Sequence, residues 1–316
     1  MTRPEPVSTT PPERDPYADG VRSSVDPPAS AVHAAVELAL AEDVGHPGDL
    51  TSLLLPPATM TARIVARAAG KLAGRACATE VFAQVDPAVS VSWQANDGDP
   101  VAAGQTLATV RGPQASVLTA ERSALNFLSH LSGIATEVAR YVAAAAAAGP
   151  AGARIRDTRK TTPGLRLLEK AAVRAGGGHN HRMGLSDWVM FKDNHLADMT
   201  IADGVAAARQ RWPDRPVYVE CDRIDQVDDA LAAGADALLL DNMTPEQVRA
   251  CVARTAGHDC LLEVSGGITP ETVAEYAATG VHYVSVGRLT NSAPALDIAL
   301  DVDEAPRTAS IAPSRD

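Results

Sequence analysis

The second half of the chain alternates between short apolar runs and amphipathic helical patterns, and this alternation limits the possible folds more than any other feature. Six apolar runs follow residue 150, at 154–158, 187–193, 217–222, 237–241, 260–266 and 283–287. Repeated strand–helix units predict parallel strands joined by right-handed crossovers. A closed or nearly closed barrel is favoured over an open doubly wound sheet, although six strands fall short of the usual eight.

The first half shows a different pattern. "SAVHAAVELALAEDVG" predicts an early helix that Ser30 can cap, and short strands joined by glycine turns are expected between residues 60 and 112. A long helical stretch follows over residues 115–149, either continuous or broken near Gly133. These signals predict a small α/β layer that a connecting helix joins to the strand–helix units.

Composition excludes several classes of protein. The net charge of −11 and the pI near 5.2 argue against nucleic acid or an anionic membrane as a partner, and no apolar run is long enough to span a bilayer. Four cysteines without CxxC spacing predict reduced thiols in a cytoplasmic protein. Residues 1–28 and 304–316 are rich in Pro, Ser, Thr and charge, which predicts disordered tails, and the N-terminal one lacks the apolar centre of a secretory signal.

Polar residues follow the predicted strands at their C-terminal ends. Nearly every run is apolar until its last residues, which are charged or small. They are Asp157, Arg159 and Lys160; Lys192 and Asp193; Glu220; Asp241; Glu263, Ser265, Gly266 and Gly267; and Gly287 and Arg288. Because the C-terminal strand ends of a parallel barrel share one mouth, we expect these residues to converge there.

Cations concentrate between residues 159 and 192, where three of the four lysines lie. A chain that elsewhere uses arginine retains lysine where a compact point charge is needed. The cations expected at the site are Arg159, Lys160, Arg182 and Lys192. Those expected to form a solvated helix face, because they are spaced four residues apart, are Arg166, Lys170 and Arg174.

Three features of the sequence predict anion binding. In "RAGGGHNHRMG", residues 174–184, the glycines are expected to let the backbone approach an anion. His179 and His181 then serve as donors to it and not as zinc ligands, because no cysteine is nearby. The other two features are "VSGGITPETV" and "VGRLT", which come last in the chain, where βα loops of barrels commonly hold phosphate.

Glu220 and Asp241 end adjacent predicted strands within this positive region. Two carboxylates suit Mg²⁺ that is also bound by substrate phosphates, and they could also stabilise a cation developing on a sugar carbon. The alternative is that they form structural ion pairs with Lys160 and Lys192. A Schiff-base lysine remains open, but it would not explain the surrounding cations. The residues favour a pocket for a phosphorylated sugar and a second, strongly anionic substrate.

Several segments closely resemble the quinolinate phosphoribosyltransferase family. They are "EDVGHPGDLTS", "AERSALNFLSHLSGIAT", "DTRKTTPGLRLLEKAAVRAGGGHNHRMGLSD", "FKDNH", "LLLDNM" and "LEVSGGIT". The likeness runs from about Ala31 to Asp301. It implies that quinolinate and 5-phosphoribosyl 1-pyrophosphate give nicotinate mononucleotide, pyrophosphate and CO₂ for NAD biosynthesis.

The resemblance also implies an architecture. An α/β sandwich domain, residues 29–128 with about 290–303, would join an incomplete TIM-like α/β barrel of about seven strands, residues 129–289. Family members are homodimers or dimer-built hexamers with shared active sites. No organic cofactor is expected, only Mg²⁺.

The resemblance assigns roles to individual residues. The implied quinolinate ligands are Arg122, donated across a subunit interface, with Thr158, Arg159, His181, Arg182 and Lys192. The implied 5′-phosphate ligands are Ser265, Gly266, Gly267, Val286, Gly287 and Arg288. The implied catalytic residues are Lys160, Lys192, Glu220 and Asp241, the two acids lying at the ribose and the metal.

The sequence departs from the family pattern at two positions and leaves two rival functions open. Arg288 stands where the family usually has a small residue, and Asn291 where histidine is common. A nicotinate phosphoribosyltransferase would share the fold but take a monocarboxylate, whereas the cations near Arg159 and Arg182 favour a dicarboxylate. A non-catalytic phosphosugar-binding barrel would have no need of the paired acids.

Overall fold

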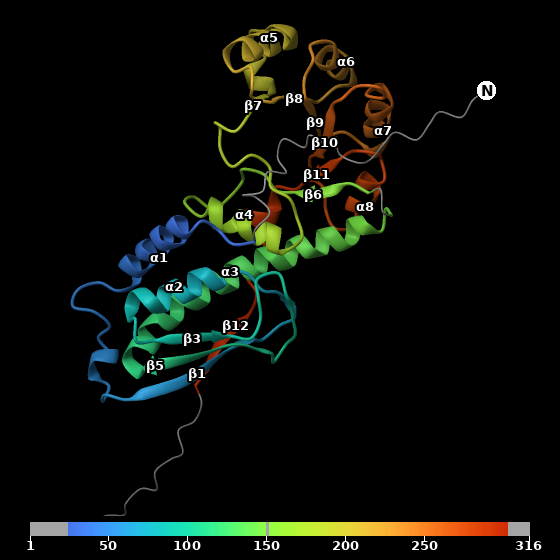
Figure 1. Ribbon diagram of the computed structural model, residues 1–316. Coiled ribbons are helices and arrows are strands. Elements are labelled where there is room, and N and C mark those ends of the chain that lie inside the picture. Colours follow the sequence, from blue (N-terminus) through green and yellow to red (C-terminus); the bar gives the residue numbers. More distant parts are fainter. Residues whose placement is uncertain (1–24, 150–151, 303–316) are drawn as a thin grey trace, which may run out of the picture. The chain divides into compact units, whose positions relative to one another are not determined.

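The computed structural model describes residues 25–149 and 152–302 and divides into two compact units (Figure 1). Of the described residues, one unit contains Ala29–Ser132 and residues 295–302. The other contains residues 25–28, 133–149 and 152–294. Of the two tails predicted to be disordered, only residues 25–28 fall within the described ranges. In those ranges no helix is both long and apolar enough to cross a membrane.

The first unit is built on an antiparallel sheet of four strands in the order β12-β1-β5-β3. The strands are β1 (Thr59–Ala66), β3 (Ser90–Trp93), β5 (Thr106–Pro113) and β12 (Ile298–Val302), and a separate short pair is formed by β2 (Gly70–Lys71) and β4 (Pro100–Val101). The helices are α1 (Ala29–Asp43), η2 (Ser52–Leu54) and α2 (Arg75–Val85). Because β12 pairs with β1, the chain returns to the first unit after it has formed the second.

Two details differ from the sequence prediction. Helix α1 begins at Ala29, so Ser30 lies inside the helix and does not cap it. Helix α3 (Gln114–Ala146) continues through Gly133 without a break and carries the chain from the first unit into the second.

The second unit contains a parallel sheet in the order β6-β11-β10-β9-β8-β7. Its strands are β6 (Arg154–Arg156), β7 (Val189–Phe191), β8 (Val217–Cys221), β9 (Ala237–Asp241), β10 (Leu261–Ser265) and β11 (Tyr283–Ser285). His179 adds a one-residue parallel bridge to Arg156 at the outer edge of β6. The α/β class is confirmed, and the predicted seven strands are reached when this bridge is counted. In the described residues no strand pairing joins the His179 segment to β7, where a closed barrel would have one.

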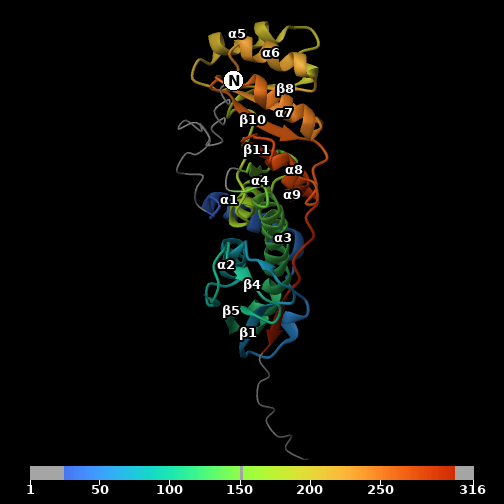
Figure 2. The same ribbon diagram turned by 90° about the vertical axis from the view of Figure 1, so that its right-hand side faces the viewer.

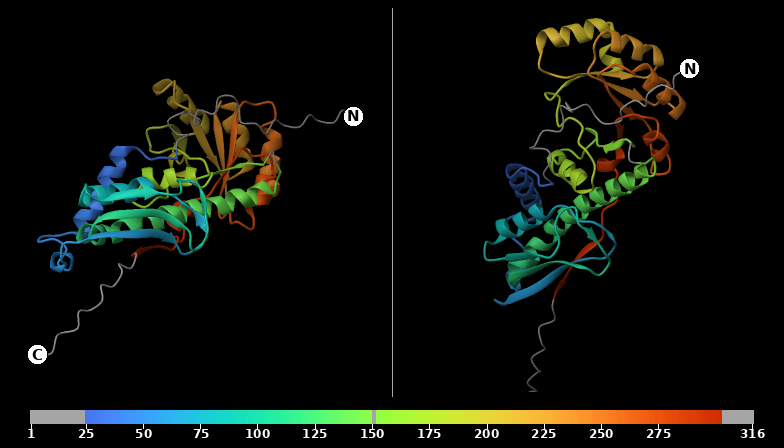
Figure 3. Two further views of the ribbon diagram at one scale, coloured as in Figure 1. Left: turned by 60° about the horizontal axis from the view of Figure 1, so that its bottom comes forward. Right: turned by 45° about the vertical axis from the view of Figure 1, so that its right-hand side comes forward.

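Helices alternate with these strands. They are α4 (Arg166–Ala175), η3 (Asp193–His195), α5 (Ile201–Arg211), α6 (Ile224–Ala232), α7 (Pro245–Arg254), α8 (Val273–Ala277) and α9 (Arg288–Asn291). Figure 2 shows α5, α6 and α7 following one another, with contacts between successive members, and the left view of Figure 3 shows the parallel strands side by side.

Two Thr-Pro pairs in the sequence, Thr244-Pro245 and Thr269-Pro270, each predict a helix start with an N-cap followed by proline, and Thr244 with Gln247 also predicts a capping box; the two starts have different outcomes. The capping box predicted for α7 is confirmed, because Thr244 and Gln247 bond each other's backbone and Pro245 occupies the first turn. The predicted start at Thr269-Pro270 is wrong. Those residues form a turn in which Thr269 N donates to Thr272 Oγ1 at 3.0 Å, and α8 begins only at Val273.

An apolar cluster fills the interior beside the parallel strands. It contains Trp188, Met190, Tyr218, Ala237, Leu239, Leu261 and Tyr283, each at most 8% exposed. The core as a whole is mainly aliphatic, yet three of the chain's eleven aromatic side chains gather in this one cluster. Side chains alternate between the two faces of a strand. A polar residue two positions after a member of this cluster therefore lies on the same face of the sheet as the cluster.

Candidate active site

A cavity of about 800 Å³ lies at the C-terminal ends of the parallel strands. All of its walls come from residues 133–294, so one unit forms it. The predicted site residues that line it are Thr158, Arg159, Lys160, His181, Arg182, Lys192, Glu220, Asp241, Ser265, Gly266, Gly267, Val286, Gly287 and Arg288. The structure brings these residues together, while their individual roles remain predictions.

The period of a β-strand explains why the acids meet in this cavity. Tyr218 belongs to the apolar cluster, and Glu220 follows it by two residues on β8. Leu239 and Asp241 have the same relation on β9. Both acids therefore point to the face that holds the cluster, one step closer to the strand ends.

Three buried nitrogen atoms in the cavity wall have no hydrogen-bond partner among the described residues: Arg159 Nε, His181 Nδ1 and Arg182 Nε. Arg182 is fixed from its other end, because its Nη1 donates to Trp188 O at 3.2 Å. Leaving a buried polar atom unbonded is unfavourable, so these atoms mark a place where a ligand would supply the missing partners. Burial, and after it the positive charge of Arg159, lowers the pKa of Arg182.

His181 is neutral at ordinary pH. Burial lowers its pKa well below 6.5, and the positive charges of Arg156, Lys170, Arg182 and Lys192 add to this effect. Its ring lies 4.9 Å from that of Trp188, and its Nε2 is 3.6 Å from Glu263 Oε1. A neutral imidazole can donate from one ring nitrogen only, so His181 offers a single oriented hydrogen bond.

The two predicted acids are held in different ways. Glu220 forms an ion pair with Lys192, whose side chain is 41% exposed. Asp241 accepts from Ser265 Oγ at 2.6 Å and from Asn242 Nδ2 at 2.7 Å, so both of its oxygens are oriented. The alternative that the acids form ion pairs with lysines therefore holds for Glu220, whereas the bonds of Asp241 are to neutral groups.

The donor set suits a metal that needs few protein ligands. Within the described parts of the chain, no three His, Cys, Asp or Glu side chains gather closely enough to hold an ion by themselves. Glu220 and Asp241 could hold Mg²⁺ only together with phosphate and water oxygens, which is how Mg²⁺ commonly binds.

Glycines shape the two predicted phosphate loops. Gly266 has φ +111°, and a Cβ there would lie 2.8 Å from Asn242 Cα. A Cβ on Gly287 would lie 2.7 Å from Lys160 Cδ, so the missing side chain makes room for that lysine. In addition, Thr290 Oγ1 donates to Lys160 O at 2.8 Å, which fixes the backbone from which the lysine extends.

The glycines of "RAGGGHNHRMG" serve packing, which corrects the prediction that they approach an anion. A Cβ on Gly176 would lie 2.5 Å from Ala135 O, and one on Gly178 would lie 2.8 Å from Val138 Cγ1. Both contacted residues belong to α3. The glycines therefore allow the segment to lie close to that helix, and only His181 and Arg182 of the motif reach the cavity, whereas His179 is exposed outside it.

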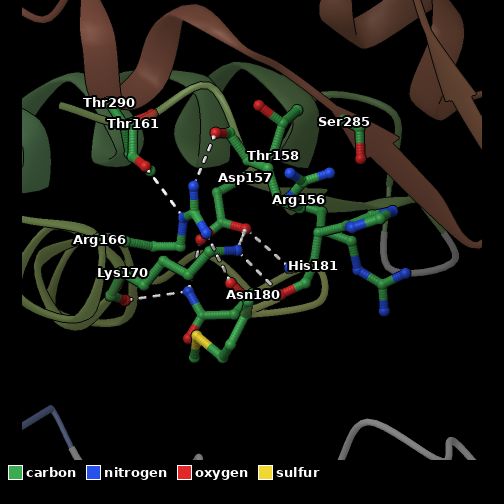
Figure 4. A network of polar contacts seen from close by, with 12 residues as sticks. Arg156, Asp157, Thr158, Thr161, Arg166, Lys170, Asn180, His181, Ser285 and Thr290 are labelled. Atoms are coloured by element: carbon green, nitrogen blue, oxygen red, sulfur yellow. Dashed lines mark hydrogen bonds and ion pairs between the residues drawn. The ribbon is translucent and has the colours of Figure 1, made fainter. Parts of the chain in front are cut away.

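The predicted solvated face of α4 is wrong for Lys170, which is fully buried. Its Nζ donates to Asp157 Oδ1 at 2.6 Å and to His181 O at 2.9 Å (Figure 4). The two other cations of this group are partly buried: Arg166 donates to Met183 O at 3.1 Å and Arg174 to Asn180 Oδ1 at 2.6 Å. Asp157, predicted at the mouth, instead faces Lys170.

A second buried ion pair was not predicted from the sequence. Arg156 Nη1 donates to Glu263 Oε2 at 2.7 Å, and both side chains are 1% exposed. Glu263 lines the cavity and also accepts from Ser285 Oγ, while the Arg156 guanidinium lies 3.3 Å from the centre of the Tyr283 ring. The signal in the sequence was an arginine inside an apolar run. We call Arg156–Glu263 and Asp157–Lys170 the support pairs.

Arg122 does not line the cavity of its own chain. It lies on α3, its side chain is 69% exposed, and its Nη2 is 4.0 Å from Glu121 Oε1. Its predicted role belongs to a partner subunit and is not tested by one chain.

Comparison with known proteins covers both units. The family descriptions "Quinolinate phosphoribosyl transferase, N-terminal domain" and "C-terminal domain" match residues 49–132 and 134–301. A probable nicotinate-nucleotide pyrophosphorylase [carboxylating] of Bacillus subtilis is 43% identical, with 83% of this chain and 90% of that protein covered. The corresponding protein of Mycobacterium leprae is 41% identical, with 86% and 97% covered. A nicotinate-nucleotide pyrophosphorylase structure from Francisella tularensis superposes with a TM-score of 0.82 at 37% identity, with 88% and 98% covered.

Proposed function

This chain belongs to the quinolinate phosphoribosyltransferase family, and on that premise we propose that the strand-end cavity is where it performs the family reaction. The protein converts quinolinate and 5-phosphoribosyl 1-pyrophosphate to nicotinate mononucleotide, pyrophosphate and CO₂ in NAD biosynthesis. The observation that carries the site assignment is that one cavity collects partnerless buried nitrogens of Arg159, His181 and Arg182 together with two oriented carboxylates.

The cation-rich wall would bind quinolinate. Arg159 and Arg182 offer planar donors that suit carboxylates, and neutral His181 adds one oriented hydrogen bond. Because these nitrogens have no protein partner among the described residues, binding a dicarboxylate would satisfy them without breaking existing bonds. This favours a dicarboxylate over the monocarboxylate of the rival nicotinate reaction.

The wall formed by β8 to β11 would bind the phosphoribosyl donor. The loops at Gly266 and Gly287 would hold the 5′-phosphate, and Glu220 and Asp241 would lie at the ribose. When pyrophosphate leaves, positive charge develops on C1′, and carboxylates already fixed in place stabilise it without reorganising. The bonds from Ser265 and Asn242 hold Asp241 in that way.

Bond changes follow from this arrangement. The ring nitrogen of quinolinate forms a bond to C1′ as the C1′–O bond to pyrophosphate breaks. The ring nitrogen becomes cationic, so the electrons of the C2–carboxylate bond can enter the ring as CO₂ leaves, and a proton then takes its place. Mg²⁺, held by Glu220, Asp241 and substrate oxygens, would neutralise charge on the leaving group.

The decisive assay supplies quinolinate, phosphoribosyl pyrophosphate and Mg²⁺ and follows CO₂ and nicotinate mononucleotide. We expect both products in equal amounts, and a chelator should abolish them. Turnover of nicotinic acid but not of quinolinate would favour the rival enzyme instead. Binding of phosphoribosyl pyrophosphate without turnover of either acid would favour a non-catalytic barrel.

We further propose a homodimer or dimer-built hexamer in which Arg122 completes the partner's site. The Arg122 side chain is 69% exposed, and its one ion pair with a described residue is the 4.0 Å contact to Glu121, so it is accessible to a neighbouring chain. Mixing inactive Arg122→Ala and Lys160→Ala proteins should restore part of the activity, since some sites would then hold both residues. No recovery after confirmed subunit exchange would count against shared sites.

The four cysteines, all buried and unpaired, support a cytoplasmic location.

A further inference from the structure

The Asp157–Lys170 support pair holds the backbone of one cavity residue from two sides. Asp157 Oδ1 accepts from His181 N at 2.7 Å, and Lys170 Nζ donates to His181 O at 2.9 Å. The two charged groups are themselves 2.6 Å apart and fully buried. His181 therefore has both its N–H and its C=O fixed by the same ion pair (Figure 4).

The same pair also orders the residue before His181. Asp157 Oδ2 accepts from Asn180 Nδ2 at 2.7 Å, and Asn180 Nδ2 donates as well to Lys170 O at 2.9 Å. Both oxygens of the Asp157 carboxylate thus accept a hydrogen bond from the segment that carries His181 and Arg182.

Backbone hydrogen bonds connect this segment to the loop after β6. Asp157 N donates to His179 O at 3.0 Å, and His179 N donates to Ile155 O at 2.8 Å. Arg159 and Lys160 lie two and three residues after Asp157 in the chain. The side chains of the buried pair and these backbone bonds together set the relative position of the two segments that supply Arg159, His181 and Arg182.

Stability alone does not explain such a pair. Removing two charges from water costs more than their attraction usually returns, and well-packed apolar residues of similar volume are often at least as stable. Neither Asp157 nor Lys170 lines the cavity, so neither contacts substrate. What the side chains of the pair supply, and apolar residues could not, is three directed hydrogen bonds to His181 and Asn180.

We propose that Asp157 and Lys170 are positioning residues that set the affinity for the pyridine dicarboxylate. The inference rests on the proposed function, in which Arg159, His181 and Arg182 bind quinolinate. Planar arginine–carboxylate pairs require donors placed to within a fraction of an ångström, and the pair meets this need for groups on two separate segments. Among the described residues, the loops at Gly266 and Gly287 form no hydrogen bond or ion pair with the side chains of Asp157 and Lys170, so phosphoribosyl pyrophosphate binding should not depend on the pair.

The test compares Lys170→Met, Asp157→Asn and the double variant Asp157→Asn/Lys170→Met. Each single change leaves a buried charge without its partner and should lower the melting temperature. The double variant removes both charges and should regain most of that loss. It still lacks the bond from Lys170 to His181 O, so we expect its KM and calorimetric Kd for quinolinate to stay raised roughly 10- to 100-fold, with the KM for phosphoribosyl pyrophosphate within about threefold of the parent value.

Two control variants separate a general loss of stability from a specific loss of quinolinate binding. Leu168→Ala removes a buried apolar side chain from the same helix, α4, so it should lower the melting temperature while leaving the quinolinate KM unchanged. Arg182→Ala removes a proposed quinolinate ligand and should raise the quinolinate KM in any case.

Each outcome has one meaning. If the double variant regains both its melting temperature and its quinolinate affinity, the pair is only structural and the proposal is overturned. If both substrates lose affinity equally, the pair does not act on the dicarboxylate and the proposal is also overturned. If Arg182→Ala itself leaves the quinolinate KM unchanged, the failure lies in the proposed site assignment.

Discussion

Charged side chains of the second unit occur in the support pairs and in the cavity wall, and the two regions differ in whether those side chains have protein partners. In the support pairs every charge has an opposite partner within 2.7 Å, and all four side chains are at most 1% exposed. In the cavity wall, Arg159 and Arg182 each keep a buried Nε that has no hydrogen-bond partner among the described residues. The stretch Arg156–Lys160 contains both kinds of charge within five residues, so proximity in sequence does not decide which kind a residue becomes.

The difference indicates a division of labour. Paired charges satisfy one another and hold segments in place, and removing only one member of a pair leaves the other buried without its partner. Partnerless charges are unfavourable for the free protein and become favourable only when a ligand supplies the missing bonds. Lys192 and Glu220 lie between these cases, because they are paired yet line the cavity, where substrate could compete for either of them.

The largest effect should come from breaking the support pair inside the sheet. Arg156→Met leaves Glu263 buried without its cation, and we expect a loss of about 3–5 kcal/mol in the free energy of unfolding. Chemical denaturation measures it. Arg249→Met, an exposed cation on α7, is the control and should change stability by less than about 0.5 kcal/mol. A loss for Arg156→Met no greater than that of the control would show that the fold does not depend on the pair.

The opposite result is expected in the cavity wall. Arg159→Met should leave the free energy of unfolding nearly unchanged. It should lower kcat/KM for quinolinate roughly 30- to 150-fold, which corresponds to a loss of about 2–3 kcal/mol in transition-state stabilisation. Arg159→Lys keeps the charge and loses the planar fork, so it should fall in between. Steady-state kinetics and denaturation on the same preparations give both values. If Arg159→Met destabilises the protein as much as Arg156→Met, the distinction between the two regions fails.

A smaller loss should follow from filling the space beside α3 that supports the His181 segment. Gly176→Ala places a Cβ 2.5 Å from Ala135 O, and only a movement of the backbone can relieve this contact. We therefore expect a loss of about 1–3 kcal/mol in the free energy of unfolding. Gly184→Ala in the same motif meets no atom within 4 Å and is the matched control. Equal melting temperatures for the two variants would contradict the packing role.

The features that could be predicted from the sequence depend on local pattern. The strand–helix alternation gives parallel strands, and the apolar-to-polar change at Asp241 or Glu220 places those residues at the mouth without knowledge of distant contacts. The Thr244 capping box is local for the same reason.

The features that were missed depend on partners far away in the chain. Four-residue spacing marks Arg166, Lys170 and Arg174 as one helix face, but only the position of Asp157 shows that Lys170 is buried. Likewise, three consecutive glycines indicate close approach without saying to what, and the answer here is Ala135 and Val138 on α3. Burial of a charge is a property of the assembled fold, so a sequence pattern alone cannot reveal it.

The smallest effect concerns pH, and it separates a neutral cavity histidine from a charged one. Burial and the surrounding positive charges lower the pKa of His181 well below the 6.5 of an unfolded histidine. Below pH 6.5 the unfolded chain therefore takes up a proton that the folded chain cannot, and the free energy of unfolding falls as pH falls, by at most about 1.4 kcal/mol per pH unit for this residue. His181→Gln removes this contribution. Between pH 7 and pH 5, the free energy of unfolding of the variant should therefore fall by about 1–2 kcal/mol less than that of the parent protein. Other titrating groups are common to both proteins and cancel in the difference. Equal slopes would mean that His181 binds its proton as readily in the folded protein as in the unfolded one, and the cavity would then present it as a further cation beside Arg159 and Arg182.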